Sequence, residues 1–440
     1  MVILGLGSNL HDRLANLRFA LTHIKQIPNF SVLQVSPVYI SDALVPDNAP
    51  VSWDTPYLNL ALHCDTTLAP HELLRHVKEI EKKVGRTPGK DWGPRIIDID
   101  LLAWDDLMLY DEKLHIPHEH LAERPFALWP LADVAPFWIY PKQDKTAAEL
   151  AAGWGSRFTG DAPFHTRQIA QRIDASQLVG IINVTPDSFS DGGHFFDALR
   201  AVEQMKHLVL AGAEIIDIGA EATNPRASAI SSDEEWQRLE PVLSAVLAAA
   251  ITMDIQPKIS VDTRHADVAS KALELGINWI NDVSGLQDVK MRKVVAASQC
   301  DVVVMHHLGI PVDKNIILLR DSNPVGLILE WAEQRLDELT QHGIAQERII
   351  FDVGIGFGKN AEQSLELLKN IDAFQRLGTR LLVGHSRKTF LGQFTDKLFA
   401  ERDIETTVLS LFLAEKRVDY LRVHNIEMHA RAFKIRGALF

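Results

Sequence analysis

The sequence predicts a multidomain α/β protein, with an N-terminal ferredoxin-like α+β domain followed by a TIM (β/α)8 barrel. The chain has 440 residues, more than one hydrophobic core usually organises, so two or more domains are expected. Its first third alternates in the order strand, helix, strand, strand, helix, strand, which is the ferredoxin-like order. The rest repeats short apolar runs followed by helical segments, and about 250 residues of such βα units are typical of a TIM barrel.

The N-terminal elements follow from the spacing of apolar residues, which alternates in strands and recurs every three or four residues in helices. In chain order we expect Val2–Leu6 (strand), Arg13–Ile27 (helix), Val32–Ile40 and Tyr57–Asp65 (strands), His71–Val84 (helix) and Ile96–Ala103 (strand). The segment Leu44–Thr55 contains two prolines and separates two strands. We expect it to be a surface loop, and closure over a substrate is the alternative.

Two aspartates in the last of these strands, Asp98 and Asp100, alternate with Ile97, Ile99 and Leu101. The strand period places both carboxylates on one face and the apolar side chains on the other. Two like charges one pleat apart repel each other unless a cation lies between them. They suit a hard divalent cation, above all Mg²⁺, that keeps positions open for phosphate oxygens. The alternative is an edge strand whose exposed face is acidic.

Cationic side chains flank this strand along the sequence. Arg95 precedes the two aspartates, Arg86 precedes the loop Thr87–Trp92, and His118 and Arg124 follow. Arginines clamp phosphate through paired hydrogen bonds, so together with a carboxylate-bound metal they suit nucleoside triphosphate chemistry. The chain has no Walker A motif, because neither of its Gly-Lys pairs has the required glycine spacing. The metal and the arginines would therefore hold ATP without a P-loop.

The motifs that contain these residues resemble hydroxymethyl-dihydropterin pyrophosphokinase over roughly the first 140–160 positions. They occur in the family's order: LGLGSN, YLNLAL, IEKKVGR, WGPRIIDIDLL, IPHEHLAERPFALWPL and APFWIYP. The resemblance implies ATP-dependent diphosphorylation of hydroxymethyl-dihydropterin, with release of AMP. Two positions depart from the pattern: Lys78 stands where the family often has Gln, and Glu119 stands where an aromatic residue is common.

The resemblance also implies roles for individual residues. Asp98 and Asp100 would bind two Mg²⁺ ions that bridge the ATP phosphates, and they would be catalytic together with Arg86 and Arg95. The pterin would be held by Tyr57, Asn59 and Phe126. The residues expected to bind ATP are Glu81, Arg86, Trp92, Arg95, His118 and Arg124.

The boundary between the domains is expected within residues 142–177, where the apolar periodicity is weaker. We predict a pterin pyrophosphokinase domain over residues 1–158, a linker and lead-in over 159–176, and a barrel over 177–440.

In the barrel part, polar residues end the apolar runs or follow them closely: Asn183, Thr223, Asp262, Asn281, His306, Asp352, Lys388, Arg422 and His424. Such positions lie on the catalytic face of a TIM barrel. Helix caps do not explain polar groups that converge from every strand, so we predict an active site here.

The barrel part resembles dihydropteroate synthase along its length, from about Leu178 to Phe440. The motifs are GIINVTPDSFSDGG, IDIGAEATNP, ISVDTR, INDVSG, VVMHH, FDVGIGFGKN, LLVGHSRKTFLG and LRVHN. This family joins para-aminobenzoate to the pterin diphosphate that the kinase makes, so the two halves of the chain would catalyse consecutive reactions. In two places the sequence departs from the family: Ala222-Thr223-Asn224-Pro225 replaces Ser-Thr-Arg-Pro, and His307-Leu308 replaces Met-Gln.

The chemistry of the condensation suggests a role for each polar residue of the barrel. Arg422 and His424, together with Asn183, suit the diphosphate and a Mg²⁺ ion. The edge of the pterin that carries hydrogen-bond donors and acceptors is expected to contact Asp262, Asn281, Asp352 and Lys388. Asp262 would stabilise the positive charge left on the pterin methylene as diphosphate departs, and we expect it to be catalytic together with Lys388. The expected lining of the para-aminobenzoate pocket is Thr223, Ser386 and Arg387.

Composition excludes several classes of partner. The net charge of −13 argues against a nucleic-acid surface, which needs a basic patch. Cys64 and Cys300 lie in apolar runs and are expected to be reduced core residues. No signal peptide opens the chain and no apolar helix is long enough to span a bilayer, so we expect a cytoplasmic protein without a membrane partner. Its expected partners are small molecules, and a homodimer through the barrel domain is left open.

Three other interpretations fit the sequence less well. A ferredoxin-like RNA-binding module would need basic and aromatic residues interleaved on its sheet. A pterin-binding methyltransferase would need a corrinoid partner domain and no diphosphate clamp, whereas Arg422 and His424 form such a clamp. A regulatory barrel without activity would not need a polar residue at the end of every strand. We therefore predict a bifunctional, Mg²⁺-dependent enzyme of folate biosynthesis.

Overall fold

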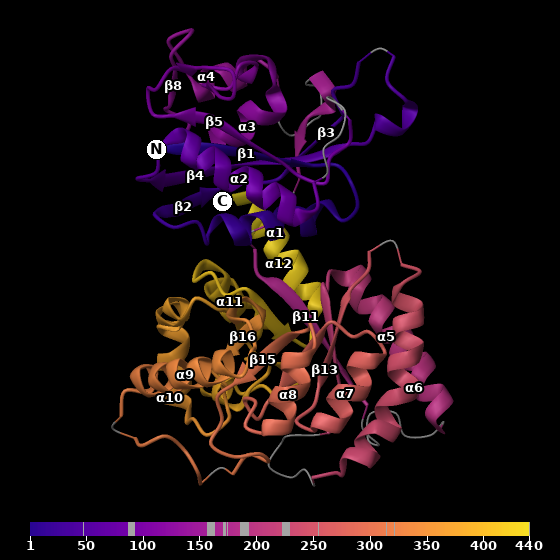
Figure 1. Ribbon diagram of the computed structural model, residues 1–440. Helices are drawn as coiled ribbons and strands as arrows, with labels where there is room; N and C mark the ends of the chain where they lie inside the picture. Colours follow the sequence, from indigo (N-terminus) through magenta and orange to yellow (C-terminus); the bar gives the residue numbers. More distant parts are fainter. Residues whose placement is uncertain are drawn as a thin grey trace. The chain divides into compact units, whose positions relative to one another are not determined.

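The structure is a computed structural model of the chain. It describes all residues except 47, 87–92, 156–162, 170–172, 174, 185–192, 222–228, 254, 314, 321 and 440, and except the side chains of 193–197 and 438. The chain divides into two compact units, coloured along the sequence in Figure 1. The N-terminal unit comprises Met1–Asp174 and Gly437–Phe440, and the barrel unit comprises Ala175–Arg436. The finer domain limits of 1–158, 159–176 and 177–440 stay a prediction.

The N-terminal unit is an antiparallel sheet with helices on both faces. Its strands are β1 (Val2–Ser8), β2 (Phe30–Val35), β3 (Tyr39–Ser41), β4 (Tyr57–Thr66), β5 (Asp98–Trp104) and β10 (Arg167–Gln168). The sheet order is β10-β3-β4-β1-β5, and β2 also pairs with β4. Its helices are α1 (Arg13–Ile24), α2 (Pro70–Val84), α3 (Pro125–Val134) and α4 (Ala147–Ala152), and two small ribbons join β6 (Leu109–Tyr110) to β7 (His115–Ile116) and β8 (Ile139–Tyr140) to β9 (Lys145–Thr146). This arrangement confirms the predicted ferredoxin-like order.

Successive side chains of β1 point to opposite faces of the sheet, and a separate hydrophobic core lies on each face. Leu4 packs in one core with Leu17 of α1 and Val77 of α2. Its neighbour Ile3 points to the other face and packs in a second core with Leu128 of α3. Figure 1 shows α1 and α2 on one side of the sheet and α3 and α4 on the other.

Two segments differ from the predicted elements. The expected strand Val32–Ile40 is divided into β2 and β3, and Pro37, which lies between them, has no amide hydrogen to donate to a ladder. The predicted lead-in contains strand β10, in which Arg167 pairs with Ile40 of β3. Before this segment the chain forms the short helix α4, whose first turn is closed by a capping box between Thr146 and Glu149.

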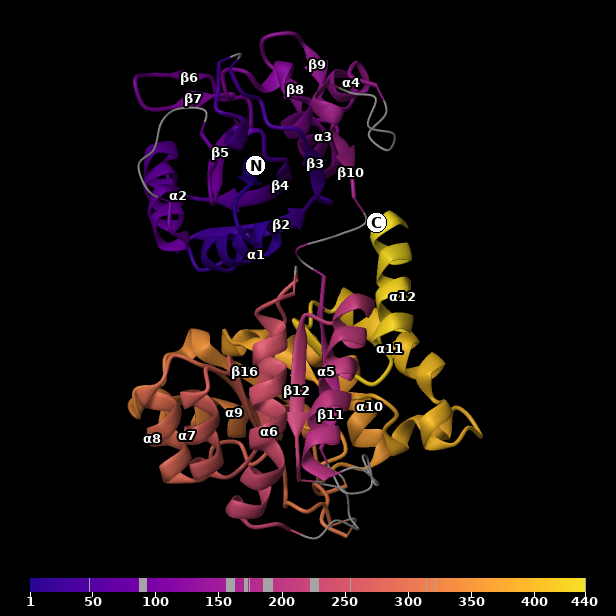
Figure 2. The ribbon, with the colours of Figure 1, turned by 90° about the vertical axis from the view of Figure 1, so that its right-hand side faces the viewer.

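The barrel unit is a closed parallel barrel, which confirms the predicted TIM architecture (Figure 2). Its strands are β11 (Gln177–Asn183), β12 (Ile215–Gly219), β13 (Lys258–Asp262), β14 (Trp279–Asp282), β15 (Asp301–Met305), β16 (Ile349–Asp352), β17 (Arg380–Val383) and β18 (Tyr420–Val423). Its helices are α5 (Gly193–Ala211), α6 (Ser232–Ala250), α7 (Ala266–Glu274), α8 (Val289–Ala297), α9 (Pro324–Gln341), α10 (Ala361–Lys369), α11 (Asp403–Glu415) and α12 (Ile426–Leu439). Among the described residues, no helix is both long and apolar enough to cross a membrane.

The barrel interior changes from apolar to polar along its strands. A buried layer contains Val179, Ile215, Trp279, Val303, Ile350, Leu382 and Tyr420. Because side chains alternate along a strand, residues two positions further on share the same face. On four strands these positions hold Asp217, Asn281, Asp352 and Arg422. The carboxyl ends of the strands therefore carry the polar groups, as they do in TIM-barrel enzymes.

Candidate active sites

A pocket of about 380 Å³ lies over β1, β4 and β5 of the N-terminal unit. Its floor is formed in part by Gly5 and Gly7 of β1, which pair in register with Asp100 and Asp98 of β5. A Cβ atom on Gly7 would come within 3.1 Å of Asn59 Oδ1, a tighter approach than most real contacts. The two glycines in LGLGSN therefore leave the floor open beside the two carboxylates.

Asp98 and Asp100 both line this pocket, as the strand period predicts. Arg86 Nη1 donates to Asp98 Oδ1 at 2.6 Å, and Arg95 donates to the other oxygen of the same carboxylate. Burial acts to raise the pKa of Asp98, but Arg95 and Arg86 hold it below its usual value. Burial and the neighbouring Asp98 raise the pKa of Asp100 to about 6.

The buried carboxylate of Glu81 links helix α2 to this acidic pair. Its Oε1 accepts from Ile99 N at 2.8 Å and lies 2.5 Å from Arg86 Nη1. Lys78, one of the two departures from the family pattern, donates to Glu81 Oε1 at 2.7 Å and to Ile99 O at 3.2 Å. Lys78 therefore contacts the backbone of the strand that carries the aspartates. It also binds the Glu81 carboxylate, which holds Arg86.

Another part of the pocket wall consists of aromatic side chains and a side-chain amide. Tyr57, Asn59 and Phe126, the three residues expected to hold the pterin, all line it. Asn59 Nδ2 donates to Ser41 Oγ at 2.9 Å, which fixes the orientation of this amide. His118 and Arg124 also line the pocket, and burial, followed by the charge of Arg124, lowers the pKa of His118 to about 4. Trp92 lies outside the described residues.

The donor set of this pocket suits the predicted metal. Two carboxylates one pleat apart provide hard oxygen ligands. Burial first, and the charge of Asp98 second, raise the pKa of Asp100, and a divalent cation would offset that repulsion. Arg86 and Arg95 add positive charge beside the same carboxylates, where phosphate oxygens would lie. The pocket therefore combines an acid pair, arginines that bind this pair and an aromatic wall.

A second cluster occupies the carboxyl ends of the barrel strands and centres on Asp217. Its Oδ2 accepts from Arg422 Nε at 2.6 Å and from Asn281 Nδ2 at 2.9 Å, and its Oδ1 accepts from Ser260 Oγ at 2.6 Å. Arg422 Nη2 also donates to Asp262 Oδ2 at 3.2 Å. One partly buried guanidinium thus joins residues from β12, β13 and β18. Arg422, Asn281 and Asp262 are brought together as predicted, through an aspartate that the sequence analysis did not select.

Burial shifts the acid–base properties of this cluster strongly. Burial and the adjacent Asp217 raise the pKa of Asp262 to about 8. Burial and the charge of Arg422 lower the pKa of Lys388 to about 8, and its Nζ lies 4.6 Å from the centre of the Phe357 ring. Burial also raises the pKa of Asp352. Shifts of this size in several neighbouring groups are typical of an active site.

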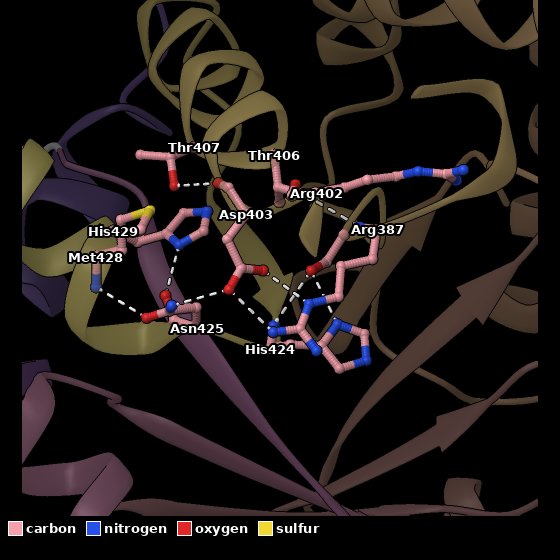
Figure 3. Close-up of polar contacts among 10 residues, drawn as sticks. Arg387, Arg402, Asp403, Thr406, Thr407, His424, Asn425, Met428 and His429 are labelled. Atoms are coloured by element: carbon pink, nitrogen blue, oxygen red, sulfur yellow. Dashed lines mark hydrogen bonds and ion pairs between the residues drawn. The ribbon is translucent and has the colours of Figure 1, made fainter. Parts of the chain in front are cut away.

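A third group of contacts connects the loops after β17 and β18 (Figure 3). Arg387 donates from Nε and Nη2 to the two oxygens of Asp403 at 2.7 and 2.9 Å, and Asn425 Nδ2 donates to the same carboxylate at 2.9 Å. The Ser386 Oγ lies 2.9 Å from His424 Nδ1. Burial, with Arg387 next, lowers the pKa of His424 to about 4. Ser386 and His424 therefore form one hydrogen-bonded pair. Arg387, the next residue after Ser386, forms a separate group with Asp403 and Asn425.

The remaining predicted residues of the barrel site are Asn183 and Thr223. Asn183 is the last residue of β11 and its side chain is exposed. Thr223 lies outside the described residues. Two residues of the site were not predicted, Asp217 and Asp403. An acid inside the apolar run IIDIG is a signal that identifies Asp217, whereas Asp403 begins α11 and its sequence context gives no sign of its partners.

Comparison with known proteins gives each unit a family. Residues 3–136 match the family described as 7,8-dihydro-6-hydroxymethylpterin-pyrophosphokinase, and residues 179–424 match the family described as pterin binding enzyme. A folate synthesis bifunctional protein of Chlamydia muridarum is 36% identical over 98% of this chain and 96% of its own length.

Solved structures resemble the barrel unit. Dihydropteroate synthase of Anaplasma phagocytophilum, solved with bound 6-hydroxymethylpterin-monophosphate, is 38% identical with a TM-score of 0.55, and the match covers 60% of this chain and 100% of that one. The synthase of Xanthomonas albilineans, solved with 4-aminobenzoic acid, is 32% identical with a TM-score of 0.55 and coverage of 60% and 93%.

The fold and the two sites define an enzyme of pterin chemistry with two catalytic units, one for phosphoryl transfer and one built on a TIM barrel. The chain belongs to the family of folate synthesis bifunctional proteins. It diphosphorylates hydroxymethyl-dihydropterin and condenses the product with para-aminobenzoate to dihydropteroate. The predicted enzyme class and function are thereby confirmed.

Proposed function

We propose that the N-terminal pocket binds ATP, Mg²⁺ and the pterin together, at residues that line the pocket and at residues that adjoin its lining. Asp98 and Asp100 hold the Mg²⁺ ions, which neutralise phosphate charge when bound. Tyr57 and Phe126 contact the faces of the pterin ring, and the amide of Asn59 bonds its polar edge. The triphosphate is held by Arg86, Arg95, His118, Arg124 and Trp92, and Glu81 keeps Arg86 in place.

In the first reaction, the pocket has to align the pterin hydroxyl group with the β-phosphate of ATP. The pterin hydroxyl loses its proton as its oxygen bonds to the β-phosphorus of ATP, the bond from that phosphorus to the α-phosphate oxygen breaks, and AMP leaves. Arg86 and Arg95 lie within hydrogen-bonding distance of Asp98, so a phosphate placed at the metal would also meet both guanidinium groups. Their positive charge stabilises the negative charge that develops on the transferred group.

We assign the second reaction to the carboxyl ends of the barrel strands. The aromatic amine attacks the pterin methylene carbon, the carbon–oxygen bond to diphosphate breaks, and the amine loses a proton. Asp262 stabilises the positive charge on the methylene, and Asn281, Asp352 and Lys388 bond the polar edge of the pterin. The diphosphate, with its Mg²⁺ ion, is held by Asn183, Arg422 and His424, and para-aminobenzoate contacts Thr223, Ser386 and Arg387.

One observation carries most of the proposal for the first site: Asp98 and Asp100 line the same pocket as Tyr57 and Phe126. The test is to incubate the purified protein with hydroxymethyl-dihydropterin and to measure AMP. We expect AMP only when both ATP and Mg²⁺ are present, and none after chelation of the metal. Undiminished AMP release in excess chelator would rule out the metal assignment.

We further propose a cytoplasmic homodimer that pairs through the barrel unit and has no nucleic-acid or membrane partner. Ile404, Val408 and Phe412 recur at helical spacing on α11 and are 68, 63 and 37% exposed, which supports an apolar contact surface. Cys64 and Cys300 are buried free thiols, as expected in a reducing compartment. A sedimentation-velocity measurement that finds only monomer at micromolar concentration would contradict the dimer.

A further inference from the structure

The segment expected to lead from one domain to the next is built into the N-terminal unit. Arg167 and Gln168 form β10 and pair with Ile40 and Tyr39 of β3, and Ile169 N donates to Val38 O at 2.9 Å. Thr166 is fully buried, and Ile173 belongs to the hydrophobic core under α1 and α2. This segment therefore extends the sheet at the strand next to β4, which carries Tyr57 and Asn59.

Phe164, just before this strand, has an unusual backbone conformation. Its φ of 61° and the φ of 41° at His165 place two consecutive non-glycine residues in the left-handed region. Each such residue costs roughly 1–3 kcal/mol and persists only where the surroundings enforce it. Here the turn is held by Thr166, whose Oγ1 donates to Pro163 O at 3.0 Å.

The turn brings both the backbone and the ring of Phe164 to the wall of the pterin pocket. Its carbonyl accepts from Asp42 N at 2.7 Å, and Asp42 and its neighbour Ser41 line the pocket. Its ring meets the ring of Phe126 edge to face, with centroids 5.8 Å apart and an interplanar angle of 72°. Ser41 in turn accepts from Asn59. Phe164 thus supports the Ser41–Asp42 turn with its carbonyl and Phe126 with its ring.

We propose that Phe164 is a positioning residue of the pyrophosphokinase reaction, which sets the Phe126 ring and the Ser41–Asp42 wall for the pterin. The inference rests on the proposed function of the N-terminal pocket. Phe164 acts on the pterin side only, because Asp98, Arg86 and Arg95 make their contacts on β5 and α2. An edge-to-face aromatic pair contributes about 0.5–1.5 kcal/mol beyond its buried area, which corresponds to a change of roughly 2- to 12-fold in an equilibrium constant.

The test is steady-state kinetics of the full-length chain with Phe164→Ala. We expect the KM for hydroxymethyl-dihydropterin to rise about 3- to 10-fold, while the KM for ATP stays within twofold of the wild-type value. Phe164→Tyr keeps the ring and should restore the wild-type KM. Phe137→Ala is the matched control, since Phe137 belongs to the same unit and is 86% exposed. Dihydropteroate formation from supplied pterin diphosphate should be the same in all variants.

Two results would overturn the inference. One is an unchanged KM for the pterin in Phe164→Ala. The other is an equal rise in both KM values with a lowered unfolding temperature, which would indicate a general structural role. Calorimetric binding of the pterin in the presence of a non-hydrolysable ATP analogue gives a readout independent of turnover. If the wild-type chain made no AMP but Phe164→Ala still bound the pterin more weakly, the proposed function would fail, while the part of the inference that concerns pterin binding would stand.

Discussion

At the scale of single residues, both sites place arginines against carboxylates inside the protein. Arg86 and Arg95 bind Asp98, and Arg422 bridges Asp217 and Asp262. A charge buried without a partner costs several kcal/mol, and each of these pairs offsets part of that cost. They also hold each guanidinium in one direction before substrate arrives, which is how preorganised charge assists a reaction.

The first prediction concerns the acid pair of the N-terminal pocket. Asp98→Ala should lower AMP production by more than about a thousandfold, because loss of a metal ligand removes several kcal/mol of charge stabilisation. The same variant, supplied with pterin diphosphate, should make dihydropteroate at the wild-type rate. Normal AMP release in this variant would refute the metal assignment.

A second prediction concerns the pH dependence of the synthase. The pKa of Lys388 is lowered to about 8, so its charge is present below that pH and lost above it. The pKa of Asp262 is raised to about 8, so its charge is lost below that pH and present above it. If both charges are needed, kcat/KM should follow a bell-shaped curve with its maximum near pH 8.

The variant Lys388→Arg separates the two limbs of this curve. Arginine stays protonated, so the alkaline limb should move to higher pH by a unit or more, although the maximal rate should fall because the side-chain geometry differs. The acid limb, assigned to Asp262, should stay in place. An alkaline limb that does not move would show that Lys388 is not the titrating group.

At the scale of elements, loop geometry fixes the carboxyl ends of the barrel strands. Gly354, two residues after the end of β16, has φ of 67°, and a Cβ atom there would lie 1.9 Å from His306 O. Lys359 Nζ donates to that same carbonyl at 2.9 Å, so the loop after β16 is held against the end of β15. The spacing of glycines in FDVGIGFGKN therefore reflects close packing of two loops.

The third prediction follows from this contact. Gly354→Ala should lower the free energy of unfolding of the barrel by about 3 kcal/mol or more, because the new methyl group displaces a backbone carbonyl. Gly343→Ala is the matched control, since Gly343 has φ of 84° but no atom within 4 Å of the added Cβ. The control should lose only about 1 kcal/mol. Equal losses, measured by chemical denaturation, would contradict the packing argument.

The elements themselves could be predicted from the sequence wherever the apolar period was regular. The eight barrel strands end where the apolar runs end, and Asp98 and Asp100 share a face as their alternation requires. Asp403 and Phe164 could not be predicted, because their partners are distant in sequence and no local pattern encodes an ion pair or an edge-to-face contact. The strand β10 was missed for a similar reason, since a two-residue strand has no period.

At the scale of the whole molecule, the two units should be separable. Contacts divide the chain between Asp174 and Ala175, and no site residue of one unit is supplied by the other among those described. The fourth prediction is that residues 1–174 alone release AMP from ATP and that residues 175–440 alone make dihydropteroate. A fragment that ends at residue 159 lacks Phe164 and β10 and should bind the pterin more weakly. An inert but folded 1–174 fragment would contradict this division.

The central claim is that one chain carries two active sites that work in sequence. Because each site lies within its own unit, we expect the intermediate to be released from the first before the second binds it. The most direct test mixes equal amounts of two inactive full-length variants, Asp98→Ala and Lys388→Ala, with ATP, Mg²⁺, hydroxymethyl-dihydropterin and para-aminobenzoate. Each variant alone should make almost no dihydropteroate, and the mixture should make it after a lag, because pterin diphosphate from one chain reaches the barrel of another. If the mixture stayed inactive while each variant kept its remaining partial reaction, transfer within one chain would be obligatory and the claim would be wrong.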